Sequence, residues 1–285
     1  MSETYRTEDW LGRTVVSEDC LTAAPVKALA ATLDRDDPAP GDGDALPPLW
    51  HWLYFLPSDQ QSALGVDGHA RRGGFLPPVP LPLRMWAGGR FEFLRPLRIG
   101  QKVTRRSRVA DIGSKTGRSG ALVFVRVEHE IADAEGVALR EEHDIVYRAA
   151  APSDAAAAAR PPSAPVDEQF SRTVVPDPVL LFRYSALTFN GHRIHYDRGY
   201  VSDVEGYPGL VVHGPLIATL LVDLLRRERP DAQLTGFAFK ALHPLFDGAP
   251  FTLCGRIDGA GGSAALWARG PEGVLAMQAD ARFSA

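Results

Sequence analysis

One seven-residue pattern occurs twice in this chain, with the same spacing and without a gap. It begins at Phe91 and again at Phe239, and it has the form Phe-x-x-Leu-x-Pro-Leu-x-x-Gly-x-x-x-Thr-x-x-x-Arg. A single shared Gly or Pro would carry no information, but seven matches at fixed offsets favour the duplication of a whole domain. A chain of 285 residues has room for two domains of ordinary size. We therefore expect two similar halves.

The clearest interruption lies between the two copies, at Ala149–Pro165. This stretch is rich in Ala and Pro and poor in aromatic residues, so it cannot bury a core of its own and is typical of a linker. The expected boundaries are therefore 1–148 for an N-terminal domain, 149–165 for the linker and 166–285 for a C-terminal domain.

Each half pairs a helix with a later series of strands. Thr22 is expected to cap a helix over Ala23–Leu33, and Gly214–Arg229 is the strongest helix, because its leucines recur on one face and Pro230 ends it. Alternating residues joined by short turns predict antiparallel strands. These strands are expected at Ala121–Ile131, Val137–Tyr147, Ala264–Arg269 and Val274–Phe283. The pattern indicates an α+β fold.

The composition of the chain argues against nucleic acid and membranes as partners. The formal net charge of −4 gives no basic surface for nucleic acid, and no stretch reaches the roughly 18 apolar residues that span a bilayer. The polar N-terminus has no apolar core of a signal peptide. Cys20 and Cys254 lie far apart and outside any metal-ligand spacing, which favours a reducing compartment. We expect a cytoplasmic protein without a membrane or nucleic-acid partner, free to form a homo-oligomer.

The residues that carry chemistry are concentrated in Phe182–Leu225. Three of the eight histidines of the chain, His192, His195 and His213, fall in this segment, together with Asn190. The segment resembles the hydratase motif of MaoC-like hot-dog proteins, a Ser/Thr-Gly-Asp-x-Asn-Pro-x-His-x-Asp run followed by a His-Gly that opens a long helix. Its matching positions are Thr188, His195, Asp197, His213 and Gly214. The resemblance implies a tandem (double) hot-dog, each half a long helix wrapped by a curved antiparallel sheet.

The chain departs from this motif at its centre. Asn190 stands where the family has its catalytic Asp, His192 where it has Asn, and Arg193 where it has Pro. In this form, and in the segments 47–52 and 84–89, the chain resembles the mesaconyl-C4-CoA (3-methylfumaryl-CoA) and itaconyl-CoA hydratases. Mitochondrial-type 3-hydroxyacyl-thioester dehydratases are similar as well. The resemblance implies reversible addition of water to the double bond of an enoyl-CoA, a short branched dicarboxylic one in that branch.

Three residues match the needs of this reaction. His195 is suited to take the proton of the attacking water, because an imidazole titrates near neutrality. Asn190 can hold that water by accepting and donating hydrogen bonds. The backbone N–H of Gly214, at the positive end of a helix, can stabilise the enolate oxygen. Residues expected to bind substrate are His192, Arg193, His213, Tyr184 and Trp86, with Arg193 assigned to a second carboxylate.

The first half lacks a His-x-Asp pair, so we expect it to be non-catalytic and to form the acyl pocket with Trp50, Trp52 and Trp86. Lys240, Arg84 and Arg90 are candidates for contacts with CoA phosphates. Asp197 is expected to bond local backbone rather than to orient His195. No metal or redox cofactor is expected, and CoA enters as part of the substrate.

Three other functions remain open at this point. One is an (R)-3-hydroxyacyl-thioester dehydratase, and another is a hot-dog acyl-CoA thioesterase, which would need a carboxylate placed at the thioester carbonyl. The third is a non-catalytic acyl-CoA binding protein, which the replacement of the motif's Asp by Asn190 keeps open. Release of free CoA would identify the thioesterase.

Overall fold

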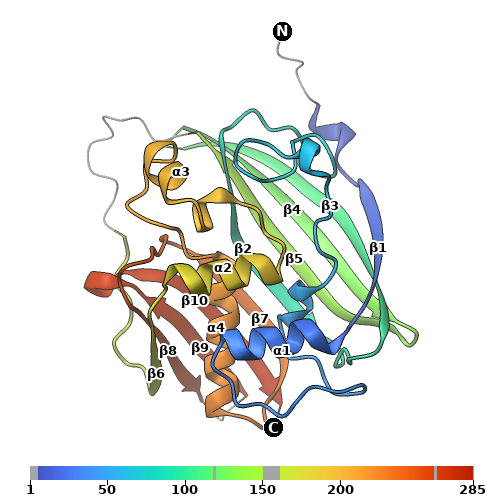
Figure 1. Ribbon diagram of the computed structural model, residues 1–285, viewed down its shortest axis with the longest axis vertical. Helices are drawn as coiled ribbons and strands as arrows, with labels where there is room; N and C mark the ends of the chain where they lie inside the picture. The colour runs from blue at the N-terminus through green and yellow to red at the C-terminus, as the bar shows by residue number, and fades with distance from the viewer. Residues whose placement is uncertain (1–5, 118–119, 150–160, 260–261, 285) are drawn as a thin grey trace.

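A computed structural model describes residues 6–117, 120–149, 161–259 and 262–284. Its ten described strands form one antiparallel sheet in the order β1-β3-β4-β5-β2-β7-β10-β9-β8-β6 (Figure 1). The strands are β1 Thr14–Cys20, β2 Leu83–Phe93, β3 Lys102–Gly117, β4 Gly120–Asp133, β5 Gly136–Arg148, β6 Phe170–Val174, β7 Gln233–Ala241, β8 Phe251–Asp258, β9 Ser263–Arg269 and β10 Leu275–Ser284. The α-helices are α1 Ala23–Thr32, α2 Pro178–Leu187, α3 Arg198–Asp203 and α4 Gly214–Glu228.

The order of the strands has a two-fold pattern centred on the pair β2 and β7. Reading outward from that pair, β5, β4, β3 and β1 on one side correspond to β10, β9, β8 and β6 on the other. The register fits a two-fold axis as well. Arg90 pairs with Ala238, which is the equivalent position 148 residues later. On either side of this pair, Phe91 pairs with Phe237 and Gly89 with Phe239, so adding 148 to one residue of a pair gives a residue of the other pair, as a two-fold axis requires. The sequence repeat has the same offset of 148 residues.

The two copies of the repeated pattern occupy matching places in this sheet. Phe91 lies in β2 and Phe239 in β7, and each pattern ends in the next strand along the chain, β3 or β8. Between them the chain turns at Gly100 (φ +90°) and Gly248 (φ +86°), a conformation that favours glycine. The expectation that both copies form a strand, a glycine turn and a second strand is confirmed.

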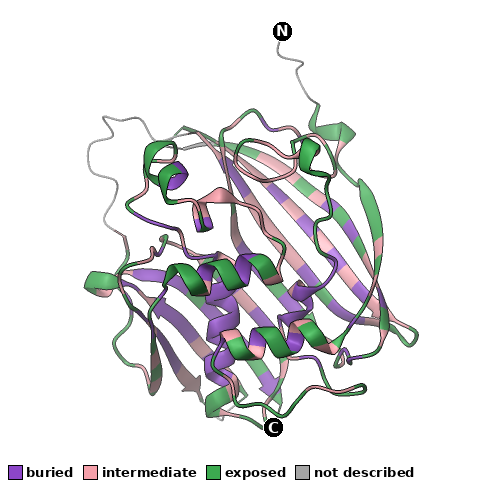
Figure 2. Cartoon of the chain, in the orientation of Figure 1, coloured by how far each residue is buried: buried purple, intermediate pink, exposed green. Residues whose placement is uncertain are grey.

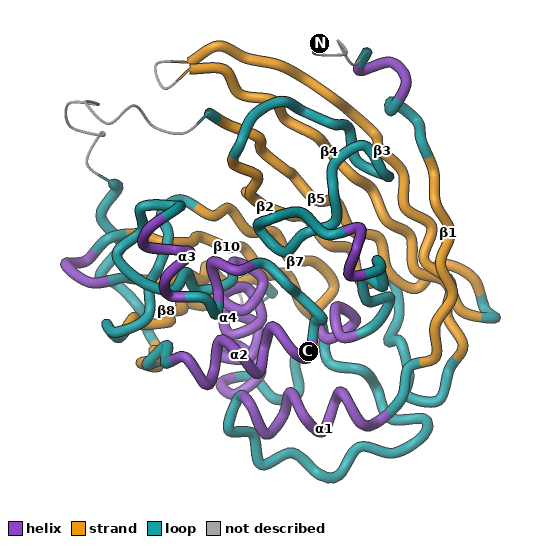
Figure 3. Tube along the Cα trace, turned by 45° about the horizontal axis from the view of Figure 1, so that its top comes forward, coloured by secondary structure: helices purple, strands orange, loops and turns teal. Residues whose placement is uncertain are grey.

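Helix α4 forms the centre of the second half. Ten of its residues, from Leu216 to Leu225, are buried, including Leu216, Ile217, Leu220 and Leu221. It packs on β6, β8, β9 and β10, whose inward residues are apolar. Figure 2 shows that this helix and the strands behind it are largely buried. The sheet curves around this helix, as the tube in Figure 3 shows. The predicted helix and the predicted strands on both sides are confirmed to within two residues.

The first half does not contain, among the described residues, the long central helix that was expected in each half, so this part of the prediction was wrong. Helix α1 follows β1 as α2 follows β6, and these two helices lie against each other. In the second half, α4 lies between α2 and β7. The equivalent segment of the first half, between α1 and β2, contains only the 3₁₀ turns η2 (Trp50–Leu53) and η3 (Gln61–Ala63) among the described residues. Nine prolines between residues 38 and 82 explain this, because a proline inside a helix removes a hydrogen bond and clashes with the preceding turn.

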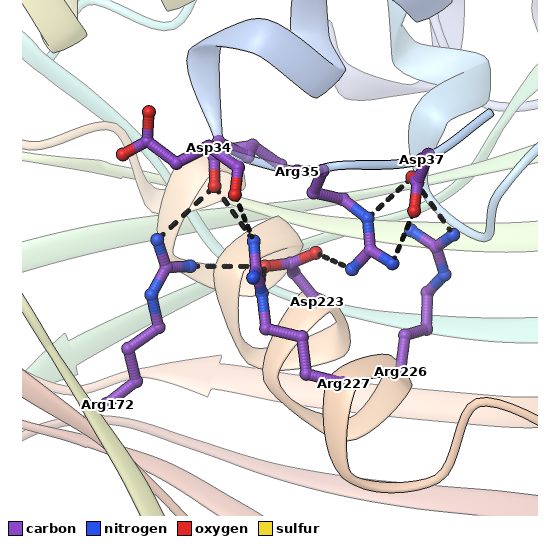
Figure 4. A network of polar contacts seen from close by, with 8 residues as sticks. Asp34, Arg35, Asp37, Arg172, Asp223, Arg226 and Arg227 are labelled. Atoms are coloured by element: carbon purple, nitrogen blue, oxygen red, sulfur yellow. Dashed lines mark hydrogen bonds and ion pairs between the residues drawn. The ribbon is translucent and has the colours of Figure 1, made fainter. Parts of the chain in front are cut away.

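A buried carboxylate ties the two halves together. Asp223 of α4 is fully buried and accepts from Arg35 (2.6 Å), Arg172 (3.2 Å) and Arg227 (2.8 Å). Arg35 follows α1, and both Arg172 and Arg227 also donate to the carbonyl of Leu33 (Figure 4). A buried charge is tolerated when it is paired and hydrogen-bonded, so this network holds α4 to the end of α1.

Three smaller expectations have different outcomes. Thr22 stands at the N-cap of α1, but its side chain makes no capping hydrogen bond, so its predicted role as a cap was wrong. Residues 150–160 of the expected linker lie outside the described residues, and the domain boundaries remain a prediction. None of the helices in the described ranges combines the length and apolarity that a membrane crossing requires.

Candidate active site

The loop after α2 directs the histidine segment inward. Phe189 adopts a φ of +49°, which reverses the chain at the end of the helix. The side-chain oxygen of Asn190 then accepts a hydrogen bond from the backbone N–H of His192 at 3.0 Å. This is the turn that an Asn-Gly pair favours. The 3₁₀ turn η4, Arg193–His195, follows and places His195 beneath the loop.

His195 is held in one protonation state. Its side chain is 7% exposed, and Nδ1 lies 2.7 Å from the carbonyl oxygen of Val211. Because a carbonyl can only accept, Nδ1 carries the proton and Nε2 keeps a free lone pair. Burial lowers the pKa of His195 to about 4, against the opposing effect of the Val211 carbonyl. Near neutral pH, His195 is therefore an uncharged base with Nε2 as the accepting atom.

His213 lies directly behind His195. The two rings stack with centroids 3.6 Å apart, and Ser185 Oγ bonds His213 Nε2 at 2.8 Å. His213 is fully buried, and its Nδ1 has no hydrogen-bond partner within the described chain. It is also the N-cap residue of α4, so the next residue, Gly214, presents its N–H at the positive end of a fifteen-residue helix.

The first half contributes to this site. Its loop at residues 65–71 lies against the histidine segment, and the N–H of Arg193 donates to the carbonyl of Asp67 at 2.9 Å. The rings of His69 and His192 are 4.1 Å apart, and His69 Nδ1 lies 3.2 Å from Asp67 Oδ2. The backbones meet so closely that a Cβ on Gly68 would lie 1.8 Å from the carbonyl oxygen of Gly191. Asp67 and His69 therefore belong to the site although they precede it by more than 120 residues.

The histidines at this contact are held neutral. Burial lowers the pKa of His69 and of His192, and the nearby guanidinium of Arg84 lowers both further. The His69 imidazole beside Asp67 helps hold the pKa of that carboxyl well below its usual range, against the effect of burial. Asp67, His69 and His192 also place ligand atoms within 4.8 Å of one another, so they could hold a metal ion.

The expected substrate-binding residues have different positions. His192 and His213 both adjoin His195, at ring distances of 5.4 and 3.6 Å. Trp86 lies next to the N-terminus of α4, since its carbonyl oxygen is 4.0 Å from where a Cβ on Gly214 would be. Tyr184 is 2% exposed behind His213, so it packs against the site and does not line it.

Arg193 is occupied elsewhere. Its Nε and Nη2 both donate to Asp197, at 3.0 and 2.7 Å, and its Nη1 donates to the carbonyl of Val66. These bonds use both edges of the guanidinium, so the contact of Arg193 with a substrate carboxylate stays a prediction that would require one of them to open. Asp197 also caps α3 by accepting from the N–H of Tyr200, so the local backbone role expected for it is confirmed.

A second polar cluster lies inside the first half. Buried Glu141 accepts from His51 Nε2 at 2.8 Å and from Trp52 Nε1 at 3.2 Å, and His143 Nε2 lies 3.3 Å from it. These contacts fasten the turn η2 to the sheet.

Trp50 is 1% exposed in the core, and the rings of Trp86 and His143 lie with their centroids 3.9 Å apart, tilted by 34°. His129, Glu141 and His143 have the spacing of metal ligands as well.

Sequence reasoning missed Asp67 and His69. The first half has no His-x-Asp pair, but it contains the same two residue types in the opposite order, as Asp67-Gly68-His69. A carboxylate and an imidazole separated by one glycine are the sequence feature from which these two residues could have been predicted to belong to the site. Nothing in the sequence indicated that this loop contacts Gly191.

Several known proteins are similar to this chain in sequence. The family model for hydroxyacyl-thioester dehydratase type 2 matches residues 49–247. A mesaconyl-C(4)-CoA hydratase from Chloroflexus aurantiacus is 52% identical over 273 residues, 95% of each chain. The mitochondrial hydroxyacyl-thioester dehydratase type 2 of Schizosaccharomyces pombe is 28% identical over 270 residues, 84% of this chain and 89% of the relative.

Solved structures share the architecture. A MaoC-like dehydratase superposes with a TM-score of 0.72 at 14% identity, covering 98% of this chain and all of the other. A Mycobacterium tuberculosis protein described as having a double hotdog fold superposes with a TM-score of 0.59 at 14% identity, covering 96% of each chain. These likenesses show that the fold is the double hot-dog expected from the sequence.

Proposed function

Because the chain belongs to the hydroxyacyl-thioester dehydratase type 2 family, we propose that it hydrates a short, branched, dicarboxylic enoyl-CoA, with 3-methylfumaryl-CoA (mesaconyl-C4-CoA) as the leading substrate. Family membership makes it a hydro-lyase. The relative that is 52% identical along 95% of both chains supports the choice of substrate. The observation that carries the proposal is the neutral base His195, whose ring stacks on that of His213, the N-cap residue of α4.

The proposed reaction begins with the attack of water on Cβ. His195 Nε2 takes a proton from the water as its oxygen bonds to Cβ, and the electrons of the double bond move to the thioester oxygen as an enolate. The N–H of Gly214 stabilises that oxygen, since the end of α4 offers an unpaired donor and a positive dipole. The imidazolium then returns its proton to Cα. Atoms and charges balance, and the reverse sequence removes water.

In this proposal Asn190 holds the attacking water with one atom only, whereas the sequence suggested that it could both accept and donate a hydrogen bond. Its oxygen is engaged by the N–H of His192, so Nδ2 is the group left to hold the attacking water. The amide cannot titrate, which leaves His195 as the proton carrier. This chemistry requires CoA as part of the substrate and no other cofactor.

A panel of thioesters tests the function. We expect the enoyl absorbance of 3-methylfumaryl-CoA to fall without release of free CoA, and chelators to leave the rate unchanged. The family assignment favours linear 3-hydroxyacyl thioesters as a second substrate class, so (R)-3-hydroxybutyryl-CoA belongs in the panel. Release of free CoA would instead identify a thioesterase, and binding without turnover a non-catalytic protein.

The cellular setting is part of the proposal. Cys20 and Cys254 are both free thiols, which suits a reducing compartment and supports a cytoplasmic location. A homo-oligomer is also proposed, and light scattering of the purified protein tests it.

A further inference from the structure

Arg84 differs from Arg90, Arg193 and Arg198 in having no acidic partner among the residues that the structure describes. It is half-buried in β2, and it forms no ion pair with a carboxylate of the described chain. Arg90, on the same strand, is paired with Glu142 and Asp144 at 2.7 Å each. Arg193 and Arg198 are paired with Asp197 and Asp247. A half-buried guanidinium without an acidic partner is uncommon, because its desolvation is then uncompensated.

A second unsatisfied group lies opposite Arg84. Arg84 and Tyr147 are direct cross-strand partners of β2 and β5, so both side chains lie on the same face of the sheet. Tyr147 is fully buried, and its hydroxyl proton has no acceptor within the described residues, while the guanidinium of Arg84 lies close enough to donate to the hydroxyl oxygen. Burial raises the pKa of Tyr147 and the nearby Arg84 opposes that rise. A donor and a cation therefore lie together without an acceptor between them.

The surroundings make this place positive. Arg72 lies 5.4 Å over the ring of Tyr147 and is held there by the carbonyls of Val79 and Pro82, at 2.6 Å each. Arg84 and Arg72 both lower the pKa of His69, and Asp67 is the carboxylate that opposes them. Two guanidinium groups against one carboxylate leave a net positive charge. The charge of Arg84 also lowers the pKa of His192, whose ring lies 4.1 Å from that of His69 and 5.4 Å from that of His195.

We propose that Arg84, with the hydroxyl of Tyr147, binds the free carboxylate of the dicarboxylic acyl group and so determines specificity for it. The inference rests on the proposed function and deepens it. In 3-methylfumaryl-CoA the free carboxylate is attached to Cβ, the carbon that water attacks. Its binding group must therefore lie in the immediate surroundings of the base. Arg84 lies two residues before Trp86 on β2, and the carbonyl oxygen of Trp86 is 4.0 Å from where a Cβ on Gly214 would be. A carboxylate there would accept from the guanidinium and from the hydroxyl.

Binding of unreactive analogues tests Arg84 without requiring turnover. Succinyl-CoA and butyryl-CoA have the same chain length and differ in a terminal carboxylate against a methyl group. We expect the wild-type protein to bind succinyl-CoA more tightly, and Arg84→Gln to reduce the ratio of the two Kd values by about 10- to 100-fold, the effect of a lost charge-assisted hydrogen bond. Tyr147→Phe should reduce the ratio less, and Arg84→Lys should retain part of it.

The ratio is measured within one preparation, so a loss of folded protein cancels. Arg90→Gln is the matched control, because it makes the same substitution on the same strand at an arginine that is already paired, and its ratio should equal that of the wild type. An unchanged ratio in Arg84→Gln, or an equal fall in Arg90→Gln, would overturn the proposal. A wild-type protein that prefers succinyl-CoA yet hydrates none of the enoyl-CoA panel would overturn the proposed function and leave the carboxylate site standing.

Discussion

The imidazole rings of His195 and His213 stack face to face, with centroids 3.6 Å apart and an angle of 18° between their planes. Two buried rings at this distance repel strongly if both are charged, and burial already disfavours a charge on either one. The pKa of His213 lies well below its ordinary value because of burial and the His195 ring. The stack therefore fixes both rings in the neutral form in which His195 can act as a base.

The first prediction is a low acid limit of activity. Because the pKa of His195 is lowered to about 4, this base stays unprotonated as the pH falls through 6.5. We expect kcat/KM for hydration to be nearly constant from pH 8 to pH 5.5, measured over the range in which circular dichroism shows a folded protein. A half-maximal rate near pH 6.5 would mean that the base is an exposed histidine or a different group.

The second prediction concerns His195 itself. His195→Gln removes the proton acceptor while preserving volume and an amide N–H that can donate to the Val211 carbonyl. We expect a loss of about 10²- to 10⁴-fold in kcat, the usual contribution of a general base, with an unchanged circular dichroism spectrum. His243→Gln, on the loop after β7, is the matched control and should keep the wild-type rate. A variant at His195 that retains a tenth of the rate would exclude it as the base.

The third prediction concerns stability in acid. His129, His195 and His213 are buried, and the pKa of each is lowered by burial. The unfolded chain therefore binds protons below pH 6.5 that the folded chain does not bind, and folding becomes less favourable as the pH falls. Each histidine should remove about 1 kcal/mol of unfolding free energy between pH 7 and pH 5.5, about 3 kcal/mol in total. Urea denaturation at both pH values measures this, and a constant free energy would contradict it.

The architecture was largely predictable because it follows from local patterns. The repeat beginning at Phe91 and Phe239 gave the two-fold arrangement, and the apolar face of Gly214–Arg229 gave the central helix. The site was predictable only within one segment. His192, His195 and His213 lie close in sequence, whereas the contact of His69 with His192 depends on how two loops from different halves meet. Long-range contacts of this kind leave no periodicity in the chain.

The fourth prediction tests that contact. Gly68→Ala would place a Cβ 1.8 Å from the carbonyl oxygen of Gly191, so the two loops must separate. We expect the variant to lose most of its activity and about 1–3 kcal/mol of unfolding free energy. Gly43→Ala is the matched control, because Gly43 has the same φ of +87° and no atom within 4 Å of its added Cβ. The Gly43→Ala variant has the same backbone strain as Gly68→Ala but no steric clash, so it should keep its activity. Equal activities of the two variants would show that the loop contact does not position the site.

The last prediction restores the carboxylate that this chain lacks. Asn190→Asp keeps the turn, because a carboxylate also accepts the hydrogen bond from the N–H of His192. A negative charge beside His195 favours its protonated form and raises its pKa, so the base is lost at a higher pH when the solution is acidified. We expect the acid limit of kcat/KM to move upward by about 1 unit, with a second ionisation from the new carboxylate in the profile. Asn190→Ala removes the turn acceptor without adding a charge, so it should slow turnover and leave the acid limit in place. An acid limit that is the same in Asn190→Asp and in the wild type would place residue 190 away from His195, and the water-binding role would then have to pass to another group of the loop.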